Sequence, residues 1–415
     1  MMPHEPASLP TPADAALDDV TLIEFGGYAA GPAIGKYLAN FGARVIHVES
    51  VARPDGFRLQ YPPYKDDRVG LNRSGCFAIF NDSKLGVTID LKRPAAVAFV
   101  RRLIARADAV IENMRPGVMA KIGLNQHVLR ADNPRLVVLS TSNLGQTGPR
   151  ATHPGFGSQL SSLSGFTELI GLPEGPPQCL YGPYIDMIAV AFGGAALLAA
   201  LDRQRRTGEG AFIDLSQYEA GLQFIAPALV DYAVNGVVAR RDGNRDSVAV
   251  PHGCYPCREH RWVTISCWND EEWVRLGDAI GQPAWAVDPR FRTAEGRRAG
   301  ETELSDHLAA WTRQREAHEV MARLQKASVH AAVVNTMEDV HADPQIAARA
   351  VWQSHDHPEI GPMRYRMGSY QLSDTPGLVR HAAPCLGEHN IAVFREWFGL
   401  SAEEYEELAA QGVFS

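Results

Sequence analysis

Residues 20–50, "VTLIEFGGYAAGPAIGKYLANFGARVIHVES", contain the pattern that predicts the fold class. The first six residues form a short apolar run typical of a buried strand, and the turn "GGYAAGP" leads from it into a helix that ends near Phe41. A second apolar run, Ala43 to Ser50, predicts the next strand. Strand, helix and strand in this order form a βαβ unit with two parallel strands.

The same alternation continues along the chain. "VTIDL" predicts a strand, Pro94 to Ala107 a helix, and "DAVIEN" and "PRLVVLST" two further strands. Strands that alternate with helices predict an α/β fold with a doubly wound, Rossmann-like parallel sheet over about the first 150 residues.

The rest of the chain changes character twice. Residues 158 to about 235 look mainly helical, and "HGCYPCREHRWVTISCW" then predicts a hairpin, followed by helices with acidic first turns. We therefore expect a flexible tail over residues 1–18, a large domain over 19–235, a smaller α+β domain over 236–335, and a return to the large domain over 336–415, with a C-terminal helix around 390–398.

Composition and targeting signals narrow the functional class. The 415 residues carry a net charge of −8, so the chain lacks the general basic character of a nucleic-acid-binding protein. The first residues show no signal peptide, and the uncharged run Met187 to Leu201 is too short and too rich in Gly and Ala for a convincing membrane span. We expect a cytoplasmic protein with neither nucleic-acid nor membrane partners.

Metal, redox and hydrolase motifs give little support to those chemistries. Six scattered cysteines do not resemble a disulfide framework, and the CxxC at Cys254 and Cys257 precedes a predicted strand instead of opening a helix. "GFGSQL" lacks the second glycine of a nucleophile elbow, and no HExxH spacing is present. We expect structural thiols and no metal site.

The ends of the early strands carry a different signal. "GGYAAGP" is not the GxGxxG of dinucleotide sites, although Glu49 ends the second strand where such a site places its ribose acceptor. Basic residues gather at or just after strand ends, where doubly wound sheets bind ligands, and would suit a phosphate-bearing ligand; a solvated surface is the alternative. They are Lys84, Lys92, Arg93, Arg115 and Lys121.

Asp186 is a charged residue in otherwise apolar surroundings. It stands in "LYGPYIDMIAVAFGGAALLAALD", at the front of a long apolar helix. An aspartate in this position caps the helix or serves as the reactive group of an enzyme.

Taken together, a series of motifs resembles the class III CoA-transferases (the CaiB/BaiF family), which include formyl-CoA transferase. The motifs occur in the family's order along nearly the whole chain. They are "AAGPAIGKYLANFGARVIHVES", "DLKRP", "ADAVIENMRPGVMAKIGL", "NPRLVVLSTSNLGQTGP", "GLPEGPP", "AALDRQRRTGEGAFIDLSQYEA", "DPRF" and "APCLGEHN".

The resemblance implies roles for individual residues. Asp186 matches the family's nucleophile, which forms an aspartyl–acyl anhydride and then an aspartyl–CoA thioester. A helix N-terminus would hold this carboxylate ionised and aimed, and backbone amides there and in "AAGP" would stabilise an oxyanion. The implied ligand is coenzyme A or acyl-CoA as substrate, without metal. The matching contact residues are Tyr28, Ala30, Ile89, Lys92, Asn113, Met114, Arg115, Lys121 and Ile122.

The chain also departs from the family at four matched positions. Ser50 and Ala29 replace an arginine and a glutamine of formyl-CoA transferase, which argues against formate or oxalate as substrate. Phe156 and Gly157 replace the His-Asp pair of the family's racemases, and phenylalanine cannot exchange a proton.

The motifs "YGPYIDMIAV", "PHGCYPC" and "NDEEW" look most like the branch that includes benzylsuccinate CoA-transferase. This implies CoA transfer from an acyl-CoA, with succinyl-CoA as the expected donor, to a small carboxylic acid, in particular a dicarboxylate such as benzylsuccinate. It also implies an interlocked dimer, either a homodimer or a heterodimer with a related subunit. The rival interpretations are an acyl-CoA isomerase or epimerase and a non-catalytic CoA-binding subunit.

Overall fold

The computed structural model describes residues 15–415 and divides into two compact units. Of the predicted tail, residues 1–14 lie outside the described residues. Residues 15–18 belong to a turn held against the fold, because Leu17 N donates to Phe41 O at 3.0 Å.

The large unit takes three segments of the chain, the first ending at Thr167 and the others being Cys179–Val238 and Ala347–Ser415. The small unit consists of Glu168–Gln178 and Ala239–Ile346. The predicted boundaries had assigned 168–178 to the large domain and ended the small domain at residue 335. Residues 168–178 carry no regular pattern that distinguishes them from the helical segments on either side, so the sequence gave no sign that they belong to the small unit.

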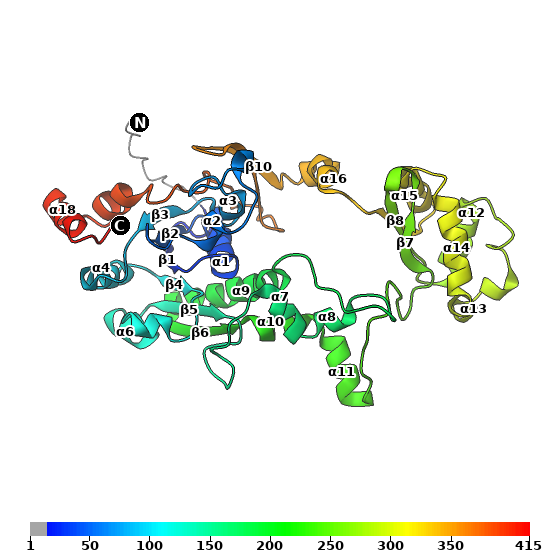
Figure 1. Ribbon diagram of the computed structural model, residues 1–415, viewed down its shortest axis with the longest axis horizontal. Helices are drawn as coiled ribbons and strands as arrows, with labels where there is room; N and C mark the ends of the chain where they lie inside the picture. The colour runs from blue at the N-terminus through cyan, green and yellow to red at the C-terminus, as the bar shows by residue number, and fades with distance from the viewer. Residues whose placement is uncertain (1–14) are drawn as a thin grey trace. The chain divides into compact units, whose positions relative to one another are not determined.

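Six parallel strands form the sheet of the large unit, in the order β3-β2-β1-β4-β5-β6 (Figure 1). This order confirms the predicted α/β class. It reverses between β1 and β4, and such a reversal opens a crevice at the carboxyl ends of the strands. The strands are β1 Thr21–Phe25, β2 Arg44–Glu49, β3 Leu85–Thr88, β4 Ala109–Glu112, β5 Val137–Ser142 and β6 Ala211–Ser216.

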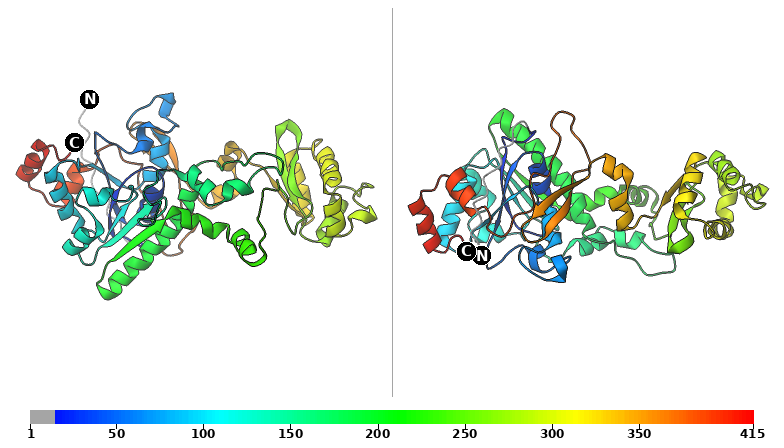
Figure 2. Two further views of the ribbon diagram at one scale, coloured as in Figure 1. Left: turned by 60° about the horizontal axis from the view of Figure 1, so that its bottom comes forward. Right: turned by 90° about the horizontal axis from the view of Figure 1, so that it is seen from above.

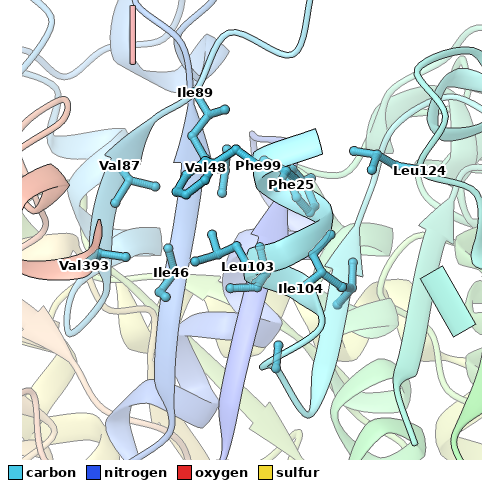
Figure 3. Packing of buried hydrophobic residues seen from close by; sticks show 14 of the residues in the cluster. Phe25, Ile46, Val48, Val87, Ile89, Phe99, Leu103, Ile104, Leu124 and Val393 are labelled. Carbon is cyan, nitrogen blue, oxygen red and sulfur yellow. The ribbon is translucent and has the colours of Figure 1, made fainter. Parts of the chain in front are cut away.

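Helices cover both faces of this sheet, since side chains of each strand alternate between two apolar clusters. Phe25 and Val48 point to the face covered by α4 and the C-terminal helical segment, where Phe99 and Val393 join them (Figure 3). Leu22 and Val45 point to the other face, which α1, α3 and α9 cover. The helices are α1 Ala30–Asn40, α2 Gly56–Leu59, α3 Gly75–Asn81, α4 Pro94–Ile104, α5 Val118–Lys121, α6 Gln126–Asp132, α7 Gly157–Leu163, α9 Tyr184–Thr207, α10 Gln217–Phe224, α11 Ala226–Asn235 and α18 Ala402–Ala410.

The helix α9 is long and apolar enough, by length and composition, to cross a membrane. One side of it packs in the large unit against β5, β6 and α1 (Figure 2). Val190, Leu197 and Leu201 pack in the same cluster as the strand residues Val137 and Leu139. We therefore describe α9 as a core helix and not as a membrane span.

The small unit has an antiparallel sheet in the order β7-β8-β9, and its first two strands form the hairpin that the sequence predicts.

The C-terminal part of the large unit differs from the prediction. The predicted C-terminal helix is a short π-helix at Ala392–Trp397, and it is followed by α18, which was not predicted. The remaining elements are α8 Phe166–Leu169, β7 His252–Pro256, β8 Trp262–Ser266, α12 Asp270–Ala279, α13 Ala294–Ala299, α14 Glu301–Thr312, α15 Ala317–Lys326, β9 His330–Val333, α16 Met337–Ala342, α17 Pro344–Ala348, β10 Trp352–His357 and β11 Gly361–Arg366.

Candidate functional site

A cavity of about 720 Å³ opens in the large unit at the carboxyl ends of the strands. Its lining comes from the ends of β1 and β2 and from the turns after β3 and β4, including Phe25, Glu49, Ile89 and Met114. This is the crevice in which doubly wound sheets bind their ligands. A cavity of this size suits a ligand larger than a simple metabolite.

The structure brings six of the nine predicted CoA-contact residues together around this cavity. They are Tyr28, Ile89, Lys92, Met114, Arg115 and Ile122. The other three do not line it: Ala30 is buried in the first turn of α1, and Lys121 is exposed at the end of α5. Asn113 acts on the cavity indirectly, because its side-chain amide exchanges two hydrogen bonds with the backbone of Gly27, at 2.7 and 3.1 Å.

Three cationic side chains line the cavity, and they suit the negative charge of a phosphate-bearing ligand. Lys92 and Arg115 belong to the predicted basic cluster, and Arg53 joins them from the loop after β2. The expectation for Lys84 is wrong. Its side chain is fully buried and donates to Glu24 Oε1 at 2.7 Å, so it cannot reach a ligand.

Glu49, which lines the cavity, is a buried carboxylate with several hydrogen-bond partners. Glu49 receives two hydrogen bonds from Arg58, at 2.8 and 2.7 Å, in a bidentate pair. Burial is the largest single effect and would raise the pKa of Glu49, but the charge and hydrogen bonds of Arg58, together with His47 and the backbone N–H of Asp55, outweigh it and the pKa is lowered. The Glu49 carboxylate is thereby occupied, and it also accepts from Asp55 N at 2.8 Å. This occupied carboxylate argues against the role of ribose acceptor.

Tyr28 holds an unusual backbone conformation in the turn above the cavity. Its φ of 63° lies in the left-handed region, which a bulky residue adopts only when the surroundings enforce it. Asp55 Oδ1 accepts from Tyr28 N at 2.9 Å, and the Tyr28 hydroxyl donates to Gln60 Oε1 at 2.8 Å. A Cβ at position 56 would collide with the Tyr28 ring, so this packing requires glycine there.

Asp186 lies in the first turn of α9, and its carboxylate touches the first residue of α7. A Cβ at Gly157 would collide with Asp186 Oδ2 and would lie 3.0 Å from the Cα of Pro183. Within residues 15–415, this Oδ2 is buried and has no hydrogen-bond partner. The residue expected from the family to be acidic is therefore the glycine that makes room for the aspartate.

Burial raises the pKa of Asp186 from its ordinary 3.8 to about 6, against a smaller opposing effect of its own backbone N–H. Burial thus acts against the helix N-terminus, which the resemblance implied would hold the carboxylate ionised. Desolvation of the carboxylate outweighs the helix dipole here. Asp186 is still mainly ionised at neutral pH, and such a poised carboxylate is typical of a reactive group.

We expect the pH dependence of acyl-enzyme formation to report this pKa. Only the ionised carboxylate attacks a thioester, so the rate should level off above about pH 7 and fall about tenfold per unit below about pH 5. Single-turnover kinetics between pH 4.5 and 8.5 measure this. A profile that stays flat from pH 7 down to 4.5 would contradict the raised pKa.

A pair of aromatic rings joins the cavity to Asp186. Phe156 precedes Gly157, and its ring meets the ring of Tyr28 edge-on, with centroids 5.6 Å apart. Cavity, Tyr28, Phe156 and Asp186 therefore form one continuous region of the large unit. Sequence reasoning missed Asp55, whose buried position gives no motif, and it treated Phe156 only as the loss of a proton carrier.

Across residues 15–415, no cluster of His, Cys, Asp and Glu could hold a metal ion, and the six cysteines are free. Burial raises the pKa of both Cys254 and Cys257, which leaves them protonated and poor nucleophiles at neutral pH.

Comparison with known proteins gives a consistent result. Residues 17–390 match the model of CoA-transferase family III. The succinyl-CoA–D-citramalate CoA-transferase of Chloroflexus aurantiacus is 34% identical over 96% of this chain and 98% of its own. The alpha subunit of the succinyl-CoA–L-malate CoA-transferase from the same species is 31% identical over 96% of this chain and 92% of its own. The crystal structure of a CAIB/BAIF family protein from Brucella suis, 30% identical, superposes with a TM-score of 0.85 over 92% of this chain and all of its own.

Proposed function

The chain belongs to CoA-transferase family III, an enzyme class whose substrates are CoA thioesters, and from this premise we propose that it moves CoA from succinyl-CoA to a dicarboxylic acid through covalent intermediates on Asp186. Benzylsuccinate is our proposed acceptor. The relatives support the donor, because the names of two of them specify succinyl-CoA.

The proposed reaction consists of four acyl exchanges. The Asp186 carboxylate attacks the thioester carbonyl, and the C–S bond breaks to give a succinyl–aspartyl anhydride and CoA thiolate. The thiolate then attacks the aspartyl carbonyl, which releases succinate and leaves an aspartyl–CoA thioester. The acceptor carboxylate attacks this thioester and expels the thiolate, which finally attacks the acceptor carbonyl of the new anhydride. Acceptor-CoA leaves, and Asp186 is regenerated.

The single observation that carries this proposal is the state of Asp186. An aspartate with a buried, unpartnered oxygen and a pKa of about 6 lies in the first turn of α9, against Gly157. The preceding residue, Phe156, pairs with Tyr28, which lines the cavity. A helix cap would be hydrogen-bonded to the N–H groups of the first turn and would have an ordinary or lowered pKa. A carboxylate needs no separate base to attack a thioester, so the lack of an acid/base residue at Phe156 is compatible with transfer.

The test is CoA transfer from succinyl-CoA to a panel of dicarboxylates, followed by chromatography of the CoA esters. The proposal expects acceptor-CoA and succinate in equal amounts. Deuterium uptake at the α-carbon of an acyl-CoA, without any transfer, would favour the isomerase or epimerase instead. No turnover until a related subunit is added would favour the non-catalytic CoA-binding subunit.

Gly157→Ala should lower kcat by roughly a hundredfold, because the new methyl group displaces the Asp186 carboxylate by about 1 Å. Gly194→Ala is the matched control: Gly194 lies in the same helix as Asp186, and a Cβ there meets open space. We expect the control to retain full activity and to be slightly more stable. Equal activity of the two variants would contradict the close contact between residue 157 and Asp186.

We also propose that the chain works as a dimer, either with itself or with a related subunit. The helix α11 has no buried residue, and its apolar side chains Val230, Tyr232 and Val234 are among the most exposed of the large unit. An apolar helix of this kind needs a partner surface. We propose further that the protein is located in the cytoplasm.

Light scattering of the eluting protein tests the assembly. We expect twice the chain mass of 45.3 kDa, and a shift of Val230→Asp to a single chain mass. A wild-type chain that stays monomeric at micromolar concentration, alone and with a related subunit, would contradict the dimer.

A further inference from the structure

Phe156 is a large apolar side chain that the fold leaves exposed beside the proposed nucleophile. It is 56% exposed, although the next residue, Gly157, is buried against Asp186. Its backbone is fixed at the start of α7, since Phe156 N donates to Gln159 Oε1 at 2.9 Å. The backbone of Phe156 is therefore fixed while more than half of its side chain is open to solvent, so a ligand can cover the ring.

The other ring of the pair, Tyr28, is rigidly supported. Asp55 and Gln60 hold its backbone N–H and its hydroxyl. The ring of Phe57 meets it edge-on, with centroids 5.4 Å apart. Tyr28 in turn meets Phe156 at an interplanar angle of 73°, an edge-to-face geometry that stabilises aromatic pairs. Phe156 therefore packs against Tyr28, a residue of fixed position that lines the cavity.

The exposed ring of Phe156 offers an aromatic surface to a ligand. Covering an aromatic face with an apolar group lowers the free energy of the complex, because apolar surface is removed from water. The same face offers no hydrogen-bond partner to a hydroxyl group, which must give up its bound water to lie there. Tyr184, two residues before Asp186 in the chain, is partly exposed at the start of α9, and its ring meets that of Phe166 with centroids 5.6 Å apart. The Phe156 side chain has neither a charge nor a hydrogen-bonding group that would bind a polar substituent.

We infer that Phe156 determines acceptor specificity, favouring dicarboxylic acids with an apolar branch or ring over hydroxylated ones. The inference rests on the proposed function and adds to it a named residue and a preference against hydroxylated acceptors. It separates this chain from the two relatives above, whose names specify citramalate and malate, both hydroxy acids.

The test is a competition between phenylsuccinate and malate as acceptors, with succinyl-CoA as donor and the ratio of their kcat/KM values as readout. The wild-type chain should prefer phenylsuccinate, and Phe156→Ala should reduce this ratio at least about tenfold, as expected for a lost apolar contact. Phe156→Leu, which keeps an apolar surface, should retain most of the preference. Trp262→Ala, which removes an exposed ring in the small unit, should leave the ratio unchanged.

The outcomes separate the two proposals. If Asp186 is acylated by succinyl-CoA but the chain prefers malate, or if Phe156→Ala leaves the ratio unchanged, the specificity inference is overturned and the transferase stands. If neither acceptor reacts and Asp186 is not acylated, the proposed function fails and the inference fails with it. Acylation of Asp186 in Phe156→Ala, whatever its rate, shows that the variant is folded.

Discussion

Asp186→Asn should lower kcat for CoA transfer by at least roughly a thousandfold. An amide is not a nucleophile toward a thioester, and loss of a covalent nucleophile removes most of the catalytic effect. The amide is nearly isosteric with the carboxylate, so it fits the space that Gly157 leaves. Steady-state kinetics with succinyl-CoA measure the effect, and binding of CoA should change little because Asp186 does not line the cavity.

The same variant should be more stable than the wild type at pH 7.5. The folded-state pKa of Asp186, about 6, lies above the ordinary 3.8, so the ionised carboxylate destabilises the fold once the pH exceeds both values. The gain in unfolding free energy should approach about 3 kcal/mol at pH 7.5 and vanish near pH 3.5.

Asp202→Asn provides the control for both readouts, because Asp202 lies in the same helix and is exposed beside Arg206. It should retain full activity and an unchanged melting temperature. If Asp186→Asn were less stable than the wild type and kept more than a tenth of its activity, Asp186 would be a structural cap.

Lys84→Met should destabilise the large unit by about 3–5 kcal/mol, the effect of breaking a buried ion pair from one side. Lys84 Nζ donates to Glu24 Oε1 and Pro32 O, both at 2.7 Å, and to Asn81 Oδ1 at 2.9 Å. Glu24 also lies 2.7 Å from His47 Nδ1. Without Lys84, the Glu24 carboxylate would remain buried beside His47 alone. Denaturant unfolding at pH 7 measures the loss.

The double variant Lys84→Met, Glu24→Gln is the control, because it removes the buried charge together with its partner. It should recover at least half of the lost stability. Burial would raise the pKa of Glu24, but Lys84 and His47 outweigh it and hold the pKa at about 2. The wild-type contribution is therefore present above about pH 4.5 and lost toward pH 2. A Lys84→Met variant as stable as the wild type would contradict the pairing.

The architecture of the large unit could be predicted because its signals are local. The apolar runs of β1 and β2 and the turn between them specify a βαβ unit by themselves, and repetition of the pattern gives the parallel sheet. The short element at Ala392–Trp397 was predicted as an ordinary helix, since periodicity does not distinguish a π-helix from an α-helix.

The site was predictable only in part, because its decisive features depend on contacts between distant segments. Lysine is rarely buried, so Lys84 was expected at the surface, and only the fold brings Glu24 to it. The pKa of Asp186 depends on α7, which the chain reaches almost thirty residues earlier. Likewise, Gly157 appeared from the sequence to be a lost acidic residue, whereas the structure gives it a steric role.

The most direct test of the central claim is to trap the covalent intermediate. The protein is mixed with succinyl-CoA and hydroxylamine, digested, and analysed by peptide mass spectrometry, with Asp186→Asn as control. We predict a hydroxamate on Asp186, absent from the control and formed faster at pH 7.5 than at pH 5. An unmodified Asp186 in a chain that still transfers CoA from succinyl-CoA to an acceptor would contradict the covalent mechanism.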